Sequence, residues 1–297
     1  MISKKFPIRY KAPLNNVINR ELASFRRLLG VIKESVADLL ANIAGQYPRP
    51  LEIEALWGRI QQNRIPDKWR WVSFQTAYDS LADYIVELGL KLDFWRTVVA
   101  NDGKAIASYW LPAFFDPRSF LTALMQARAR YEEIPMKDLR NDYEVLEVAS
   151  VSEPCKEKHA VHLHGLALEG ADWNWERKLV VETTKSTRFV AFPVVKARTV
   201  HLGKASAAAQ LESGQGPNAA KKKKKQTAGD EGTGAEAVPG VQKFRCPVYR
   251  TTSRLSTGLV AADNAPEHYL RLNTLERPEK WTKRAVALLL ETDRADE

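Results

Sequence analysis

The sequence predicts an α+β fold, with a helical half over about residues 1–140 and a β half over about 141–297. Two observations carry this prediction. Apolar residues recur with a helical period through the first half, whereas short segments with alternating apolar residues begin near Tyr143. Because helices and strands are segregated along the chain, an α+β arrangement is favoured over a parallel sheet with alternating helices.

The strongest helix prediction covers Leu14–Ala44. Its apolar residues alternate at spacings of four and three, which makes one continuous stripe. The stripe consists of Ile18, Leu22, Phe25, Leu29, Ile32, Val36, Leu39 and Ile43. The same spacing is that of a heptad seam, so a coiled coil is the alternative. Tyr47, Pro48 and Pro50 end the helix.

Two further helices are expected before residue 100. A short one covers Leu51–Gln62, and Pro66 then breaks the chain before an aromatic cluster. That cluster consists of Trp69, Trp71 and Phe74. A longer helix is predicted over about Phe74–Val99, and Asp102-Gly103 makes a turn after it. Its stripe is Leu81, Ile85, Leu88, Leu92, Trp95 and Val99.

Asp116-Pro117 predicts the start of the last helix of this half. Asp116 supplies a side-chain acceptor at the N-cap, and a proline suits the first helical position because its missing N–H is not needed there. This helix is expected to run to about Tyr131, with Pro135 after it.

Short strands are predicted from Tyr143 onward. They cover Tyr143–Val148, Ala160–Leu168, Phe189–Val195, Phe244–Thr251, His268–Leu275 and Trp281–Leu290. The last segment also suits a helix. We favour a strand because Val286, Leu288 and Leu290 alternate and few residues remain to cap a helix.

A low-complexity insert lies between the predicted strands, at about 202–241. It is rich in Ala, Gly, Gln and Lys, contains the run Lys221–Lys225, and has no aromatic residue. Such a composition cannot bury enough apolar surface to offset the entropy of ordering, so we expect a disordered surface loop.

Charge, cysteine content and the lengths of apolar runs limit the possible classes of function but do not identify one. The net charge is +9, of which the segment 203–240 contributes only +2, so basic residues are spread along the chain and suit an acidic partner surface. The two cysteines, Cys155 and Cys246, form no CxxC pair, which fits a reducing compartment. We expect neither a signal peptide nor a membrane span, because no run of about 18 apolar residues occurs.

Several patterns are candidates for catalytic or ligand sites. No G-x-x-x-x-G-K-[ST] motif occurs, and Gly214-x-Gly216-x-x-Ala219 lies in the insert without a preceding strand, so nucleotide binding is not predicted. His162 and His164 would share one face of a strand, as paired metal ligands require, but no third ligand has recognisable spacing.

Carboxylates and thiols offer weaker candidates. Glu169, Asp172 and Glu176 lie among tryptophans, which is compatible with sugar cleavage but equally with an acidic turn. Cys155 and His159 are four residues apart in a charged loop with no oriented base, and Cys246 is expected to be a small core residue. The sequence therefore predicts no catalytic, cofactor-binding or metal-binding residue.

Two cationic segments remain open to interpretation. Arg128 and Arg130 end a helix, where they could complement the helix dipole or dock to an acidic neighbour. Lys221–Lys225 could contact a polyanion or nucleic acid, but a solvated insert is the simpler interpretation.

Three blocks carry ordered packing motifs. Tyr109–Arg130 is an aromatic run that leads into a helix ending near Gln126 and Ala129-Arg130. His162–Trp175 contains a His-Gly-Leu strand followed by Leu-Glu-Gly-Ala and a tryptophan, and Phe244–Thr251 contains Cys-Pro-Val-Tyr-Arg-Thr. In this order, the blocks resemble the C-terminal domain of dynein heavy chains.

Other segments extend the resemblance over about Pro7 to Leu290, without the insert. They are the Tyr10–Leu29 helix, Pro193-Val194 and the closing segment Trp281–Leu289. Leu255–Gly258 is more similar to axonemal than to cytoplasmic members. Two departures occur, because Pro112-Ala113 replaces a usual serine-glycine pair and Ala167 replaces a usual aromatic residue.

The resemblance implies helices plus an antiparallel partial β-barrel on one face of a six-module AAA+ ring. It implies a non-catalytic domain that braces the ring and tunes a microtubule motor, with ATP and Mg bound in other modules. The implied partners are that ring and, through the whole complex, intermediate chains, light chains and microtubules, in the cytoskeleton of a cilium or flagellum; neither membrane nor nucleic acid is expected.

Two alternatives stay open. The sequence could encode a free-standing binding protein whose Lys221–Lys225 loop contacts tubulin or another polyanion. It could also encode an unrelated hydrolase that uses His162, His164 or Glu169.

Overall fold

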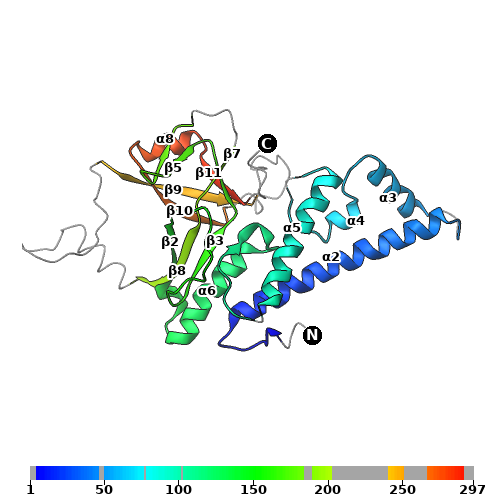
Figure 1. Cartoon of the computed structure of the whole chain (residues 1–297), viewed down its shortest axis with the longest axis horizontal. Coiled ribbons are helices and arrows are strands. Elements are labelled where there is room, and N and C mark those ends of the chain that lie inside the picture. Colours follow the sequence, from blue (N-terminus) through cyan, green and yellow to red (C-terminus); the bar gives the residue numbers. More distant parts are fainter. Residues whose placement is uncertain are drawn as a thin grey trace, which may run out of the picture.

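The computed structural model describes residues 5–46, 50–76, 78–101, 103–183, 189–202, 240–250 and 266–290. Helices fill the first half and strands the second, so the predicted α+β class is confirmed (Figure 1). The helices are α2 (Pro13–Ile43), α3 (Leu51–Gln61), α4 (Asp67–Arg70), α5 (Leu81–Ala100), η1 (Leu111–Ala113), α6 (Pro117–Glu132), η2 (Met136–Asp138) and α8 (Pro278–Lys283).

The strands form two mixed sheets that together make a nearly closed, barrel-like body. The first has the order β1-β3-β8-β2 and the second β5-β6-β10-β9-β11-β4-β7. Their bounds are β1 Tyr109–Trp110, β2 Leu139–Val145, β3 Ala160–His164, β4 Leu166–Glu169, β5 Asp172–Asn174, β6 Leu179–Val181, β7 Phe189–Ala191, β8 Val195–His201, β9 Gln242–Tyr249, β10 His268–Thr274 and β11 Ala287–Leu290. Most pairs are antiparallel, but β1–β3, β6–β10 and β9–β11 are parallel.

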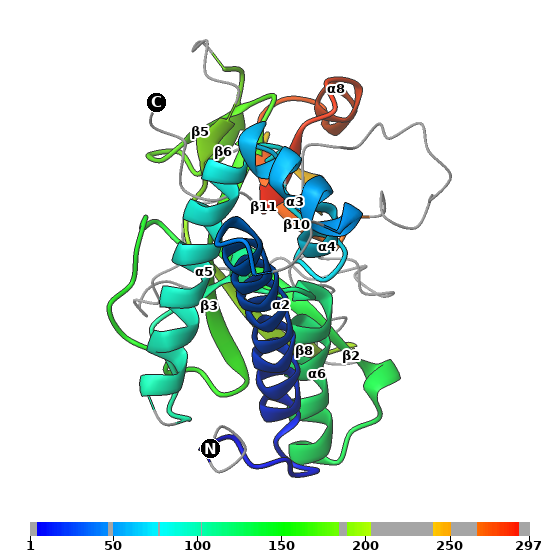
Figure 2. The ribbon, with the colours of Figure 1, turned by 90° about the vertical axis from the view of Figure 1, so that its right-hand side faces the viewer.

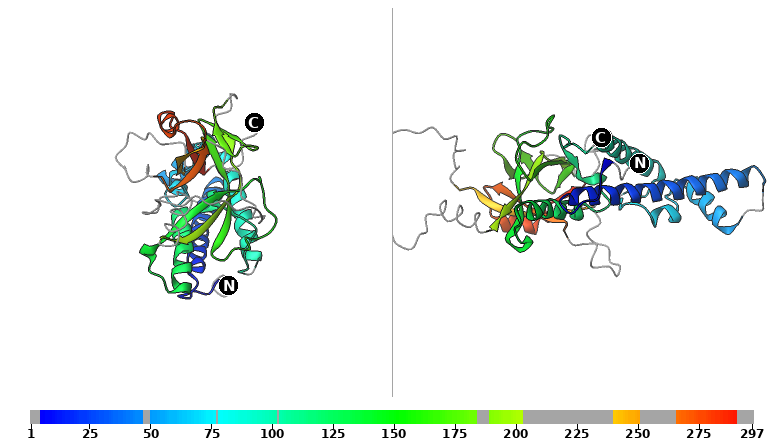
Figure 3. Two further views of the ribbon diagram at one scale, coloured as in Figure 1. Left: turned by 90° about the vertical axis from the view of Figure 1, so that its left-hand side faces the viewer. Right: turned by 90° about the horizontal axis from the view of Figure 1, so that it is seen from below.

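Helix α2 is the axis of the helical half. It lies between α5 and α6, and its outer half extends beyond the strands with α3 packed at its end (Figures 2 and 3). Phe25 and Leu28 are fully buried, whereas Leu29 and Ile43 of the predicted stripe are exposed. Because α6, α3 and α4 each contact α2, this helix is not one strand of a long coiled coil within the described residues.

The helix predicted over Phe74–Val99 begins later, at Leu81. Its first turn is fixed by two side chains: Ser80 Oγ accepts from the N–H of Asp83 at 3.4 Å, and Asn63 Oδ1 accepts from that of Ala82 at 3.1 Å. These acceptors satisfy the N–H groups of Ala82 and Asp83, which have no partner within the helix when it begins at Leu81. The cluster before it splits, since Trp69 and Phe74 are buried while Trp71 is 87% exposed.

Two predicted strands are each interrupted. Ala160–Leu168 is divided at Gly165, whose φ of +85° is unsuited to an extended strand. The segment predicted over Phe189–Val195 is divided between β7 and β8, which belong to different sheets, with Phe192, Pro193 and Val194 between them.

The strand predicted over Trp281–Leu290 is wrong in its first part. Pro278 begins the short helix α8, which carries Trp281 into the core, and only Ala287–Leu290 is a strand. The Trp281 Nε1–H donates to Thr274 Oγ1 at 2.7 Å, so the burial of one tryptophan outweighs the local alternation.

The helix predicted at Asp116-Pro117 is confirmed. Asp116 Oδ1 accepts from the N–H of Ser119 at 3.2 Å, and the helix runs to Glu132. Helix α6 packs on β2 and β8, where Asn141 Nδ2 donates to the Leu121 carbonyl at 2.8 Å. Helix α6 therefore joins the helices to the sheet.

Candidate functional site

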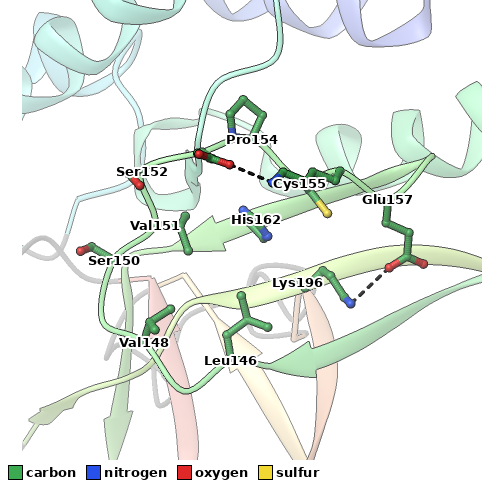
Figure 4. A pocket seen from close by; sticks show the side chains of 12 residues that line it. Leu146, Val148, Ser150, Val151, Ser152, Pro154, Cys155, Glu157, His162 and Lys196 are labelled. Carbon is green, nitrogen blue, oxygen red and sulfur yellow. Dashed lines mark ion pairs between the residues drawn. The ribbon is translucent and has the colours of Figure 1, made fainter. Parts of the chain in front are cut away.

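A groove of about 580 Å³ lies beneath the connection between β2 and β3 (Figure 4). The connecting segment from Leu146 to Glu157 forms one wall, and His162 of β3 and Lys196 of β8 complete the lining. The groove gathers a thiol, an imidazole, an amine and carboxylates. Of the candidate histidines and cysteines, only Cys155 and His162 line it.

The two histidines of β3 hold the segment before β1. His162 Nδ1 lies 3.0 Å from the carbonyl oxygen of Ala107, and His164 Nδ1 lies 2.7 Å from Ser108 Oγ. Because a carbonyl can only accept, Nδ1 of His162 carries the proton. Within the described part of the chain, no group of three or more His, Cys, Asp and Glu residues is arranged to hold a metal ion.

Cys155 and His159 lie in different places and contact different neighbours. Cys155 lines the groove, whereas the ring of His159 packs against Tyr131 at 5.2 Å and its Nε2 lies 3.9 Å from Glu132 Oε1. Cys246 is fully buried on β9, and burial raises the pKa of its thiol. A protonated core thiol is a poor nucleophile, so packing is its role here.

Lys196 stays cationic in the groove. Its Nζ lies 2.6 Å from Glu144 Oε2 and 3.2 Å from Glu157 Oε2. The hydrogen bond to Glu144 is the main cause that raises the pKa of Lys196, so the amine is not available as a base near neutral pH.

The acidic candidates near the tryptophans shape a turn. Asp172 Oδ1 accepts from the N–H of Trp173 at 2.7 Å, and Trp173 is buried against Phe192 with ring centres 5.1 Å apart. Glu176 is exposed in the turn that follows. Trp173 therefore packs in the core, whereas Trp175 is 41% exposed. Asp172 is engaged by its own turn.

The cations of α6 bind neighbours within the same polypeptide. Arg128 donates to the carbonyl of Thr199 on β8 and pairs with Glu132 at 3.1 Å. Arg130 donates to the Tyr10 carbonyl at 2.6 Å and lies over the Tyr10 ring at 4.4 Å. These contacts fasten the N-terminal segment to α6. The only carboxylate among them is Glu132 of α6 itself, so they select neither of the two interpretations left open by the sequence.

A buried polar junction joins the helices to β9 and β10. Glu21 of α2 is 1% exposed and accepts from the N–H groups of Phe115 at 2.6 Å and Asp116 at 3.1 Å. Burial is the main cause that raises the pKa of Glu21. Burial would also raise the pKa of Asp116, but hydrogen bonds from Ser119 together with the charges of Arg250 and Arg20 outweigh it, so that pKa is lowered.

Arg250 completes the junction from the end of β9. Its Nε lies 2.6 Å from Glu267 Oε1, and its Nη1 donates to the Phe115 carbonyl at 2.9 Å. Its Nη2 also lies 3.5 Å from Asp116 Oδ1. The sequence alone identifies Asp116 but not Glu21 or Arg250 as members of this junction. The position of Glu21 next to Leu22 of the apolar stripe is the one feature of the sequence that indicates a buried acid.

Two buried side chains of α5 hold the backbone at Pro112-Ala113. The Lys91 amine donates to the Pro112 carbonyl, and Trp95 Nε1 donates to the Ala113 carbonyl at 3.0 Å. Lys91 is 2% exposed and lies 4.4 Å from the centre of the Phe74 ring. Burial is the main cause that lowers the pKa of Lys91.

Other predicted features lie outside the described residues. These are Gly214, Gly216 and Ala219, the run Lys221–Lys225, nearly all of the insert, and Leu255–Gly258. In the described part, no helix is both long and apolar enough to cross a bilayer.

Comparison with known proteins gives a consistent result. The chain is 28% identical over 297 residues to dynein axonemal heavy chain 1 of Mus musculus, with 98% of this sequence and 6% of that protein covered. It is 26% identical over 294 residues to dynein axonemal heavy chain 12 of Homo sapiens, with 99% and 8% covered. Dynein axonemal heavy chain 11 of Sus scrofa is 28% identical over 286 residues, with 95% and 5% covered.

The protein therefore spans less than a tenth of the length of these relatives, and what it shares with them is one domain. The family model for the C-terminal domain of dynein heavy chains matches residues 1–214, which include the helical half, Glu21 and Asp116 of the junction, and strands β1 to β8. The chain belongs to the family of C-terminal domains of dynein heavy chains.

Proposed function

We propose that this chain is the non-catalytic, regulatory C-terminal domain of an axonemal dynein heavy chain, which braces the AAA+ ring of that heavy chain and tunes a microtubule motor. ATP and Mg act in other modules. Intermediate chains, light chains and microtubules are then partners of the whole complex, in the cytoskeleton of a cilium or flagellum.

One observation carries the bracing role. Helix α5 presents an apolar face to solvent, on which Ile85 is 53%, Val86 49% and Leu90 46% exposed. Trp71, at the end of α4, is 87% exposed. Large apolar side chains gathered on one face are typical of a surface that another protein covers.

Buried hydrogen bonds between the helices and the sheet favour a rigid domain, as a bracing role requires. The buried contacts of Glu21, Arg250 and Lys91 tie α2, α5, α6 and β9 together through side-chain and backbone hydrogen bonds. His162, His164 and Asp172 bind backbone or hydroxyl groups rather than one another. We further propose that residues 1–140 and 141–297 act as two subdomains, the first of which contacts the ring.

The test combines the 297-residue protein with an axonemal dynein motor that lacks its own C-terminal domain. We expect no ATP turnover by the 297 residues alone, binding to the ring, and a changed gliding velocity of microtubules. The double substitution Ile85→Asp and Leu90→Asp should abolish binding, because it places charges on the apolar face.

The matched control is Leu275→Asp, which adds a charge at a 47% exposed leucine after β10. It should bind as the parent protein does. ATP turnover by the isolated domain would contradict the non-catalytic assignment. Ring binding that survives Ile85→Asp with Leu90→Asp would show that the α5 face is not the contact.

A further inference from the structure

Strands β9 and β10 present a basic face to solvent. The two strands pair antiparallel, and Phe244, Cys246, Leu270 and Leu272 point to the buried side. Side chains alternate along a strand, so the intervening residues share the opposite side. We call that side the basic face; it contains Lys243, Arg245, Tyr269 and Arg271, which are all exposed.

Two arginines of the basic face oppose each other directly. Arg271 is the cross-strand partner of Arg245, and like charges placed opposite one another destabilise a sheet. The Arg245 guanidinium lies over the Tyr269 ring, 3.9 Å from its centre, which orders one of the two cations but neutralises neither.

The cations of this face lack acidic partners in the described part of the chain. No carboxylate oxygen of the described residues lies within 4.0 Å of a side-chain nitrogen of Lys243, Arg245 or Arg271. Other cations on the strands differ from these. Lys196 and Arg198 on β8 pair with Glu144 and Asp142 of β2, so these two cations have counter-charges within their own sheet.

We propose that the basic face binds an acidic polypeptide segment in an extended conformation. A carboxylate between Arg245 and Arg271 would accept hydrogen bonds from both guanidinium groups and remove their repulsion. Lys243 lies two residues along the same strand, about 7 Å away. Carboxylates at alternate positions of an extended segment have the same spacing, so a second acidic residue reaches Lys243.

The chemistry favours a protein segment over a nucleic acid or a membrane. The face holds three cations on two strands, whereas recognition of a lipid surface takes clusters of about four or more basic residues. One side of the Tyr269 ring is already covered by Arg245, which leaves a poor platform for stacking bases. The inference uses none of the residues Lys221–Lys225 and does not depend on the motor assignment.

The test measures fluorescence anisotropy of a labelled peptide, Glu-Ser-Glu-Ser-Glu-Ser, as the 297-residue protein is added. We expect saturable binding that weakens as salt rises. The double substitution Arg245→Gln with Arg271→Gln should weaken binding at least tenfold. Thermal unfolding followed by circular dichroism checks that this variant is folded.

Two matched controls separate this site from general attraction to a basic protein. Arg26→Gln with Arg27→Gln removes the same charge from exposed positions of α2, and replacement of Lys221–Lys225 by glutamine removes the run in the insert. Both should bind the peptide within about twofold of the parent protein at about 0.15 M salt, where distant charges are screened.

Three results would overturn the proposal. The first is no saturable binding by the parent protein. The second is equal weakening by the α2 control and by the Arg245 and Arg271 variant. The third is tighter binding of a single-stranded oligonucleotide of equal charge, lost in the same variant, which would assign the face to nucleic acid instead.

Discussion

Lys91 Nζ lies 3.2 Å from Glu87 Oε1, and the two side chains are only 3% and 7% exposed. The pair sits one helical turn apart on α5, and Thr76 Oγ1 donates to the other carboxylate oxygen at 2.5 Å. A charge left alone in such a place has no water to replace its partner. The stability of the helical half therefore depends on both members being present.

Replacement of Lys91 by methionine should destabilise the protein strongly. It leaves the Glu87 carboxylate and the Pro112 carbonyl without their shared donor, and we expect a loss of about 3–5 kcal/mol in the free energy of unfolding. Urea unfolding monitored by tryptophan fluorescence measures it. The exposed pair Asp93–Arg96 is the control, because Arg96→Met should cost less than about 1 kcal/mol.

The double variant Glu87→Gln with Lys91→Met separates pairing from packing. With neither charge present, we expect it to be more stable than Lys91→Met alone. If the double variant is the less stable of the two, the ion pair is not the cause of the single-site loss.

Gly165 should tolerate no side chain. A Cβ at this position would lie 2.4 Å from Trp110 Cδ1 and 2.7 Å from Pro112 Cδ, in addition to its φ of +85°. We expect Gly165→Ala to cost about 3 kcal/mol or more, measured by the same unfolding assay. Gly45→Ala is the control, since Gly45 has a φ of +75° but open space around it, and should cost only about 1–2 kcal/mol. Equal losses at the two positions would remove the steric argument.

Asp116 combines a helix cap with a charge at the junction. Asp116→Ala should cost about 1–2 kcal/mol, because the first turn of α6 loses its acceptor. Asp116→Asn keeps an acceptor and loses only the pairing with Arg20 and Arg250, both partly exposed, so it should cost less than about 1 kcal/mol. Chemical unfolding of the two variants checks the order; a larger loss in the asparagine variant would show that the charge matters more than the cap.

His268 should make the fold sensitive to mild acid. Both ring nitrogens are buried without a hydrogen-bond partner in the described structure, and the ring packs on Tyr143 at 4.9 Å. Burial lowers the pKa of His268 to about 3. The unfolded state binds a proton near pH 6.5 that the folded state does not, so stability falls as the pH drops from about 6.5 towards 3.

Between about pH 7 and pH 5, this single proton corresponds to about 2 kcal/mol. His268→Phe keeps the aromatic contact and cannot titrate, so it should lose about 2 kcal/mol less than the parent protein over that range. Urea midpoints at the two pH values provide the comparison, and parallel pH profiles for the two proteins would refute the assignment.

The sequence predicted local features better than their assembly. Asp116-Pro117 starts a helix by its own chemistry, and the aromatic run at Tyr109–Phe120 does reach the core. The start of α5 was misplaced because Asn63, 18 residues away from Leu81, supplies part of its cap. Alternating apolar residues near Trp281 predict a strand. The site that buries the Trp281 side chain beside Thr274 is formed by β10, and a pattern in the neighbouring sequence carries no information about β10.

The candidate site residues show the same division. Absence of a catalytic set was an expectation from spacing, and it stays a prediction. The spacing of His162 and His164 does not reveal their partners. These are Ala107 and Ser108, which lie more than 50 residues away along the chain. Glu21 was hidden for the same reason, since its acceptor role depends on backbone N–H groups more than 90 positions later.

Strand β11 comes last among the described strands, yet it lies in the interior of the seven-stranded sheet, parallel to β9 and antiparallel to β4. During synthesis, β4 and β9 therefore leave the ribosome with two facing edges that nothing yet bridges. Unpaired edges invite pairing with other molecules. The order of translation thus leaves this domain dependent on prompt arrival of Ala287–Leu290, or on a chaperone that shields those edges until the strand arrives.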